Sequence, residues 1–222
     1  MNNNDIIIIG GGLGGLTTGA LLAKEGRKVT VLEKNNIVGG GLQNFTRKGI
    51  LFDTGMHMLG GFRPGQTLYR ICQHLGIMQK LKLQRVDSDC MDEIYYASNH
   101  ITYRVAEGKA GFVESFATHF PHQRTQLQRY LDAIYELADE IDLFNLRPTG
   151  DGIPLHSERF MWSADEFIAH YIDDEQLRDV LAYMNPMYGG VSGHTPAYVH
   201  ALISALYING TDRFVGGSQQ LA

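Results

Sequence analysis

The chain has 222 residues, of which 44% are hydrophobic and 19% are charged, and this balance is typical of a globular protein. Its formal net charge of -5 provides no basic surface of the kind that neutralises phosphates, so nucleic acid is excluded as a partner. The two cysteines, Cys72 and Cys90, belong to no CxxC pair, which fits a reducing, cytoplasmic compartment.

The N-terminal residues contain no basic segment and no small-residue cleavage site, so we do not expect a signal peptide. The longest apolar stretch, residues 199–208, is about half as long as the ~20 residues that a membrane-spanning helix needs. We therefore predict a cytoplasmic protein, with peripheral contact to a membrane as the alternative.

The N-terminal segment has the pattern of a βαβ unit. Residues 5–10 form an apolar, β-branched run that predicts a fully buried strand, and residues 13–24 carry apolar side chains at helical spacing up to Gly26. Residues 28–33 alternate Val29 and Val31 with polar residues and predict a second strand. This order predicts an α/β fold with a Rossmann-like domain and a right-handed crossover.

The composition changes beyond Pro64. Fifteen of the 26 glycines lie in residues 1–65, and 11 lie in the remaining 157 residues, so we place a domain boundary near Pro64-Gly65. Residues 81–86, 93–97 and 101–105 predict a small antiparallel sheet, and residues 126–144 predict a long amphipathic helix. We expect a second, α+β domain over residues 66–212, built from this sheet and several helices.

The turn between the first strand and the helix is a candidate dinucleotide site. Residues 10–15 read GGGLGG and satisfy GxGxxG between a predicted strand and a predicted helix. We expect Gly10 to make the tight turn, Gly12 to let the backbone approach a pyrophosphate, and Gly15 to let the helix pack close to the sheet. Glu33 follows 23 residues after Gly10, where an acid accepts hydrogen bonds from the adenosine ribose and disfavours a 2′-phosphate.

Further segments extend this pattern. Gly19 and Gly26 continue the first motif, residues 33–42 read EKNNIVGGGL, residues 52–57 read FDTGMH, and residues 216–221 read GGSQQL. Together they resemble the FAD-binding fingerprint, the second glycine motif, the FDxGxH stretch and the GGS segment of the flavin amine oxidase superfamily. Within that superfamily the chain resembles the phytoene desaturases, carotenoid isomerases and retinol saturases. The resemblance is most specific in residues 1–65.

This resemblance implies that FAD is the cofactor and lies across the first glycine turn. It places Glu33 at the ribose, residues 40–42 along the pyrophosphate and ribityl chain, and residues 55–57 near the isoalloxazine. The candidate FAD-binding residues are Gly10, Gly11, Gly12, Leu13, Gly14, Gly15, Glu33, Lys34, Gly40, Gly41, Leu42, Gly55, Met56 and His57.

The resemblance also implies an activity, namely FAD-dependent desaturation or saturation of a carbon–carbon bond in an apolar polyene or isoprenoid, such as a phytoene- or retinol-like compound. It makes residues 1–65 the N-terminal part of the FAD-binding domain, residues 66–212 a substrate domain, and residues 213–222 the start of the return to the FAD-binding domain. Family members continue past the GGS segment, so we expect a truncated member that is inactive alone and self-associates. Because the flavin performs the hydride exchange, we name no catalytic side chain.

Two other functions stay open. GDP-dissociation inhibitors resemble this fold and bind prenylated partners without catalysis, although their nucleotide turn is degraded and this one is intact. Other flavin oxidases of the superfamily act on amines or porphyrinogens. Amine oxidases carry arginine at the third position of the second glycine motif, where this chain has Gly41, and this difference argues against an amine substrate.

A metal site is not expected. The closest pair of histidines, His119 and His122, is interrupted by Pro121, and neither cysteine lies near them in the sequence.

Overall fold

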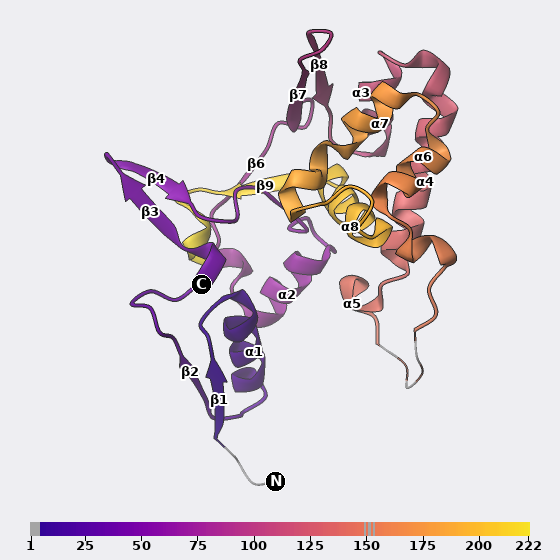
Figure 1. Ribbon diagram of the computed structural model, residues 1–222. Helices are drawn as coiled ribbons and strands as arrows, with labels where there is room; N and C mark the ends of the chain where they lie inside the picture. The colour runs from indigo at the N-terminus through magenta and orange to yellow at the C-terminus, as the bar shows by residue number, and fades with distance from the viewer. Residues whose placement is uncertain (1–4, 149, 151, 153) are drawn as a thin grey trace. The chain divides into compact units, whose positions relative to one another are not determined.

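The computed structural model describes residues 5–148, 150, 152 and 154–222, which form two compact units (Figure 1). Unit 1 consists of Met1–Arg85 together with Asp212–Ala222, and unit 2 consists of Val86–Thr211. The chain therefore leaves unit 1, builds unit 2 and returns. No helix in the described residues is long and apolar enough to cross a membrane.

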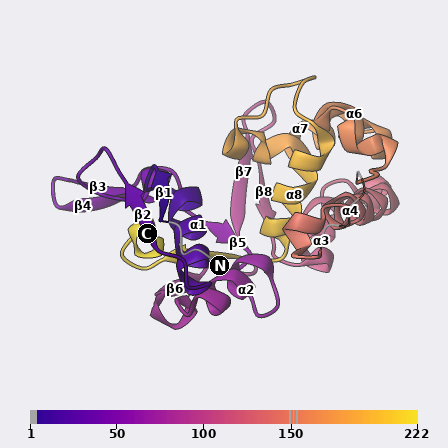
Figure 2. The ribbon, with the colours of Figure 1, turned by 90° about the horizontal axis from the view of Figure 1, so that it is seen from below.

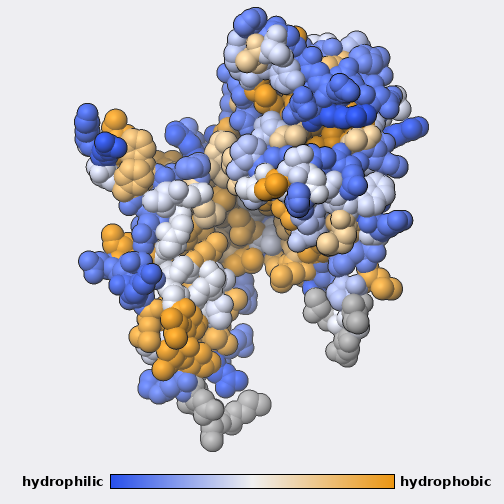
Figure 3. Space-filling view, in the orientation of Figure 1, coloured by the Kyte–Doolittle hydropathy of each residue, from blue (hydrophilic) through white to orange (hydrophobic). Residues whose placement is uncertain are grey.

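Unit 1 begins with the predicted βαβ unit. Strand β1 (Ile6–Ile9) pairs in parallel with β2 (Val29–Leu32), and helix α1 (Leu13–Lys24) connects them. The prediction of a fully buried first strand is wrong, because Ile7 is 64% and Ile9 is 87% exposed. Only one face of this two-stranded sheet packs on α1, and the other face is part of the apolar surface at the lower left of Figure 3.

A β-hairpin follows the βαβ unit. Its strands are β3 (Asn44–Arg47) and β4 (Ile50–Asp53), which pair antiparallel with Phe45 opposite Phe52. The two rings stack with their centroids 5.2 Å apart, although both side chains are exposed. The hairpin places Asn44 and Asp53 together at its base, where the glycine segments of the site lie.

The remainder of unit 1 surrounds a small core. Its members are β5 (Leu59–Gly60), α2 (Thr67–Leu75), the 3₁₀ turn η2 (Met78–Lys80), β6 (Leu83–Arg85) and β9 (Thr211–Phe214). Phe62 packs edge-to-face on Phe214, and Cys72 of α2 completes this core. The strands form one sheet in the order β5-β9-β6, in which β6 runs antiparallel to β9.

This core changes two sequence expectations. The first boundary between the units lies at residues 85/86 and not at 65/66, because α2 and β6 pack on Phe62 and Phe214. The segment 81–86 does not join the antiparallel group with 93–97 and 101–105, because β6 pairs with β9, about 130 residues later. Whether the units serve as FAD and substrate domains stays a prediction.

Unit 2 contains a second hairpin and a helical layer. Strands β7 (Asp92–Tyr96) and β8 (Ile101–Val105) pair antiparallel as expected. The helices are α3 (Lys109–Ala117), η3 (Pro121–Gln123), α4 (Arg124–Asp139), α5 (Asp142–Asn145), η4 (Glu158–Met161), α6 (Ala164–Tyr171), α7 (Glu175–Leu181), η5 (Ala182–Tyr188) and α8 (Ala197–Ile208). Helix α4 packs on α3 and α8 (Figure 2). The expected helix 126–144 is interrupted at Ile141, whose backbone is extended.

A buried histidine connects three elements of unit 2. His200 of α8 is completely buried, and its Nε2 lies 2.7 Å from the hydroxyl of Tyr130 in α4. Its Nδ1 lies 3.1 Å from the hydroxyl of Tyr188 at the end of η5. Burial lowers the pKa of His200 to about 4, so the imidazole is neutral near pH 7.

Candidate functional site

The first glycine turn has the backbone geometry that the sequence predicts. Gly10 has φ +104°, a conformation that a residue with a Cβ rarely adopts. A Cβ on Gly15 would overlap the carbonyl oxygen of Gly10, so α1 starts directly against the strand end. At Gly12, in contrast, a Cβ would meet nothing within 4 Å. The space beside Gly12 is therefore open for a ligand.

The N-terminus of α1 is suited to a phosphate. Its N-cap residue is Gly12, which has no side chain to accept the N–H groups of the first turn, and the first turn contains no acidic residue. The first N–H groups of an α-helix have no partner within the helix, and the helix dipole places partial positive charge there. A pyrophosphate can satisfy these groups, as it does at other glycine-rich turns.

Glu33 follows β2 and contacts the turn directly. Its Oε2 accepts the backbone N–H of Gly11 at 2.8 Å, and its Oε1 accepts the N–H of Asn35 at 2.9 Å. The N–H groups of Asn35 and Gly11 lower the pKa of Glu33 below its ordinary value. A negative charge thus lies at the side of the glycine turn, where a ribose hydroxyl can donate to it. The ribose contact itself stays a prediction.

The second glycine segment packs against the first one. Gly39, with φ +117°, donates its N–H to the carbonyl of Gly11 at 2.6 Å and forms a parallel bridge with Gly12. A Cβ on Gly40 would lie 3.2 Å from the Cα of Gly12, so the two backbones are in contact. The 3₁₀ turn η1 (Gly40–Leu42) continues from there, with Gly41 exposed and Leu42 buried.

The FDTG segment (residues 52–55) packs against the second glycine segment. The hydroxyl of Thr54 donates to the carbonyl of Gln43 at 2.8 Å and lies 3.2 Å from that of Gly41. A Cβ on Gly55 would lie 3.0 Å from the Gly41 carbonyl oxygen. Residues 53–55 are therefore held beside residues 41–43.

The C-terminal segment completes this cluster through Ser218, which is fully buried at the start of the 3₁₀ turn η6 (Ser218–Leu221). Its N–H donates to Asp53 at 2.8 Å, its hydroxyl donates to the same carboxylate at 2.9 Å, and this hydroxyl lies 3.0 Å from the Leu42 carbonyl. Asn44 also donates to Asp53 and accepts the N–H of Gln219 at 3.0 Å. Segments more than 160 residues apart thus form one structure.

Partial burial alone would raise the pKa of Asp53, but the hydrogen bonds from Ser218 and Asn44 outweigh it and lower the pKa. Asp53 and Asn44 were not among the predicted site residues. The FDTG stretch contains Asp53, so that motif held the signal, whereas nothing in the sequence indicated Asn44.

Not all predicted residues join the cluster. Lys34 and His57 are exposed, and Met56 is half-buried, at the edge of the described site. Their proposed contacts with the cofactor stay predictions. Among the described parts of the chain, no group of three or more His, Cys, Asp or Glu side chains is arranged to hold a metal ion.

Comparisons with known proteins identify relatives of the chain. The family model for an NAD(P)-binding Rossmann-like domain matches residues 8–75. All-trans-retinol 13,14-reductase from Macaca fascicularis is 24% identical over 98% of this chain and 38% of its own length. Prolycopene isomerase 2 from an Oncidium hybrid is 28% identical over 70% of this chain and 26% of its length. The 4,4'-diapophytoene desaturase of Staphylococcus aureus is 25% identical over 96% of this chain and 43% of its own length.

Solved structures share the fold. Putrescine oxidase superposes with a TM-score of 0.66 at 21% identity, over 98% of this chain and 47% of that protein. A RAB GDI from Plasmodium falciparum superposes with a TM-score of 0.55 at 16% identity, over 98% of this chain and 54% of that protein. At these identities the likeness establishes the fold alone.

The chain spans about two fifths of the length of the retinol reductases that it matches. The second glycine segment contacts the first glycine turn, and the FDTG and GGS segments contact the second glycine segment. The chain is a homologue of the retinol 13,14-reductases, prolycopene isomerases and diapophytoene desaturases, and it carries a Rossmann-like dinucleotide-binding unit.

Proposed function

We propose that the chain provides the dinucleotide-binding part of a FAD-dependent oxidoreductase that acts on a carbon–carbon bond of an apolar polyene or isoprenoid. The observation that carries this proposal is the cluster at the N-terminus of α1. There, the open space at Gly12, the uncapped helix start and the Glu33 carboxylate lie together.

The residues of the site fit a dinucleotide with FAD's features. The space that a Cβ would fill at Gly12 and Gly14 is empty, which leaves room for a pyrophosphate on the helix N-terminus. Glu33 supplies an acceptor for ribose hydroxyls, and its negative charge opposes a 2′-phosphate. FAD satisfies both conditions, whereas NADP does not.

The chain's own residues would bind and orient the cofactor. The N–H groups at the start of α1 would hold the pyrophosphate, and the segment at residues 39–42 would fix the turn through its contacts with Gly11 and Gly12. When bound, the flavin supplies hydride exchange with a carbon centre. The hydrogen bonds of Asp53 with Ser218 and Asn44 would keep residues 53–55 beside the second glycine segment.

The names of the homologues support a polyene substrate. Retinol, prolycopene and diapophytoene are the compounds in their names. Gly41 replaces the arginine of amine oxidases and disfavours an amine substrate. The fold likeness to putrescine oxidase and RAB GDI does not separate these alternatives, because all three share the architecture.

Calorimetric titration of the chain with FAD tests the cofactor assignment. We expect saturable binding of one FAD per chain with a micromolar dissociation constant, and weaker binding of NADP. Gly12 has φ -80° and no neighbour within 4 Å of a Cβ, so Gly12→Val should fold normally and lose at least tenfold in affinity. Thr30→Val, on the exposed side of β2, is the matched control. Full FAD affinity in Gly12→Val would contradict the site.

Because the chain spans about two fifths of the length of the retinol reductases, anaerobic reduction of an FAD-loaded protein of that full length, containing this chain, tests the substrate class. We expect flavin bleaching, or reoxidation of the reduced flavin, with retinoid or carotenoid substrates and no bleaching with simple amines. Reduction by amines alone would favour an amine oxidase. Binding of prenylated peptides without any FAD binding would favour a GDP-dissociation-inhibitor function.

A further inference from the structure

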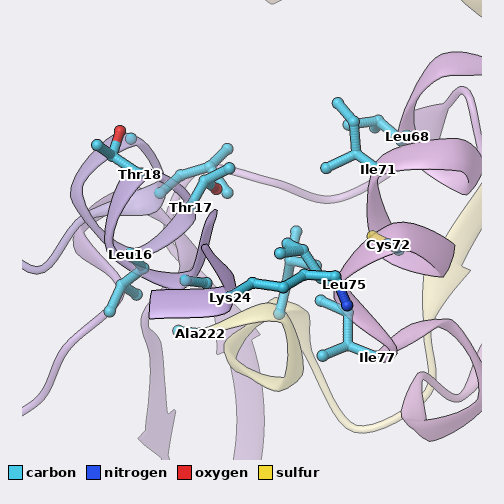
Figure 4. A pocket seen from close by; sticks show the side chains of 14 residues that line it. Leu16, Thr17, Thr18, Lys24, Leu68, Ile71, Cys72, Leu75, Ile77 and Ala222 are labelled. Atoms are coloured by element: carbon cyan, nitrogen blue, oxygen red, sulfur yellow. The ribbon is translucent and has the colours of Figure 1, made fainter. Parts of the chain in front are cut away.

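Unit 1 contains an apolar pocket along the side of α1, and Leu13 and Gly14 are the candidate FAD-binding residues among its lining. It lies between α1 and α2 and has a volume of about 630 Å³ (Figure 4). This volume is within the range of small-molecule sites, which are mostly apolar with a few polar groups. Its walls are formed by aliphatic side chains of α1, α2 and the segment after α2, among them Leu16, Leu68, Ile71, Leu75 and Ile77.

One cation lies at this pocket. Lys24 is the last residue of α1, and its side chain extends toward Leu75 and Ile77, where the ammonium group ends beside the aliphatic wall (Figure 4). In the described part of the chain, Lys24 has no ion pair and no hydrogen bond from its side chain. Lys28, which precedes β2, is by contrast paired with Asp5 at 3.2 Å.

The pocket follows the length of α1. Its lining includes Leu13 and Gly14 at the start of the helix and Lys24 at its end. At 1.5 Å per residue this distance is about 16 Å, which accommodates most of an extended long hydrocarbon chain. Cys72, which is buried, lines the wall on α2, and burial raises the pKa of its thiol.

We propose that this pocket binds an amphiphile with a hydrocarbon chain and an anionic head, of the long-chain carboxylate class, with the carboxylate at Lys24. The hydrocarbon chain removes the aliphatic walls from water, and the carboxylate provides the partner that Lys24 lacks. The carboxylate position at Lys24 lies at the opposite end of α1 from the proposed pyrophosphate position, although Leu13 and Gly14 belong to both sites.

Fluorescence titration with cis-parinaric acid, a polyene fatty acid, tests the proposal in the absence of FAD. Titrations stay below the micelle concentration of the probe, and parinaryl alcohol is the uncharged counterpart. We expect one saturable site per chain with micromolar affinity for the acid, and about tenfold weaker binding of the alcohol, because a charge-assisted hydrogen bond is lost.

Two variants separate the head-group contact from the chain contact. Lys24→Gln should remove the preference for the acid and leave alcohol binding unchanged, whereas Lys24→Arg should keep the preference. Lys48→Gln, at the tip of the hairpin and outside the pocket, is the matched charge control. Ala20→Phe, at an exposed position of α1 that lines the pocket, should weaken both probes at least tenfold.

Equal affinities for acid and alcohol in the wild-type chain would overturn the proposal, as would a preference for the acid that survives Lys24→Gln. Sedimentation velocity tests whether a second copy of the chain occupies the pocket instead. A dimer that Ala20→Phe disperses, together with no saturable probe binding, would assign the pocket to a second copy of the chain. Failure of FAD binding leaves these results unaffected, because the probes are titrated without FAD.

Discussion

The carboxylate of Glu33 accepts the backbone N–H of Gly11 at 2.8 Å, although the two residues are 22 positions apart. Glu33 therefore holds the glycine turn at the end of β2 before any ligand is present. This acid fixes the turn, and we predict that it also accepts hydrogen bonds from a ribose.

Glu33→Ala should weaken FAD binding by roughly tenfold to a hundredfold, because a charge-assisted hydrogen bond to the ribose is lost. Titration calorimetry of both proteins with FAD measures the change. Asp5→Ala removes an exposed carboxylate from the same unit and serves as the control. Unchanged FAD affinity in Glu33→Ala would remove this residue from the site.

The pKa of Glu33 also predicts a pH dependence of stability. The pKa of Glu33 is lower in the folded chain than its ordinary value of 4.5. Unfolding therefore takes up a proton at pH values between the folded-state pKa and 4.5. The stabilisation is present above pH 4.5 and is lost as the pH falls through the folded-state pKa. Thermal melts of the wild-type chain and Glu33→Gln should therefore converge toward low pH. A difference in melting temperature that is independent of pH would contradict this expectation.

Two glycines of the first turn should behave differently when changed to alanine. A Cβ on Gly15 overlaps the Gly10 carbonyl, so Gly15→Ala should lower the free energy of unfolding by about 1–3 kcal/mol. A Cβ on Gly12 meets no protein atom, so Gly12→Ala should leave stability unchanged and weaken FAD binding. Urea denaturation and FAD titration of both variants separate the two effects.

Ser218→Ala should detach the C-terminal segment from the glycine cluster. The change removes the hydroxyl that donates to Asp53, and it should raise the pKa of Asp53 and lower stability by about 1–3 kcal/mol. Hydrogen exchange in residues 216–222 should become faster. Ser98→Ala, in the exposed turn of the β7–β8 hairpin, is the control.

His200 should make unit 2 less stable in acid. Its pKa is about 4 in the folded chain and 6.5 in its ordinary state, so unfolding takes up a proton between these values. Stability is therefore constant above pH 6.5 and falls by roughly 3 kcal/mol toward pH 4. The surrounding groups are Tyr130, Tyr188 and the more distant charge of Asp165, which partly opposes the shift. His200→Gln should remove this part of the pH dependence, whereas His74→Gln, at an exposed position, should keep it.

Local patterns predicted the local structure. The alternation of Val29 and Val31 and the spacing in residues 13–24 identified the βαβ unit, because such signals depend on neighbouring residues. The pairing of β6 with β9 was missed, since the strands have only three or four residues and are about 130 positions apart. Their partnership depends on the core around Phe62 and Phe214, which no short window of sequence contains.

In the candidate site, too, local features were predictable from the sequence and long-range contacts were not. The open space at Gly12 and the close approach at Gly15 were predictable, because a glycine turn between strand and helix has few alternatives. The link between Asp53 and Ser218 was not, because it joins residues 165 positions apart. The motifs indicated that both segments matter, but not that one carboxylate connects them.

Unit 2 is an insertion between two segments of unit 1, and its chain ends are adjacent: the N–H of Val86 donates to the carbonyl of Thr211 at 3.1 Å. During synthesis on the ribosome, strand β9 and Ser218 emerge only after all of unit 2. Unit 2 can therefore fold while the dinucleotide cluster is still incomplete. Because the two ends of unit 2 are adjacent, a short linker from residue 85 to residue 212 can replace unit 2 and keep the two segments of unit 1 connected.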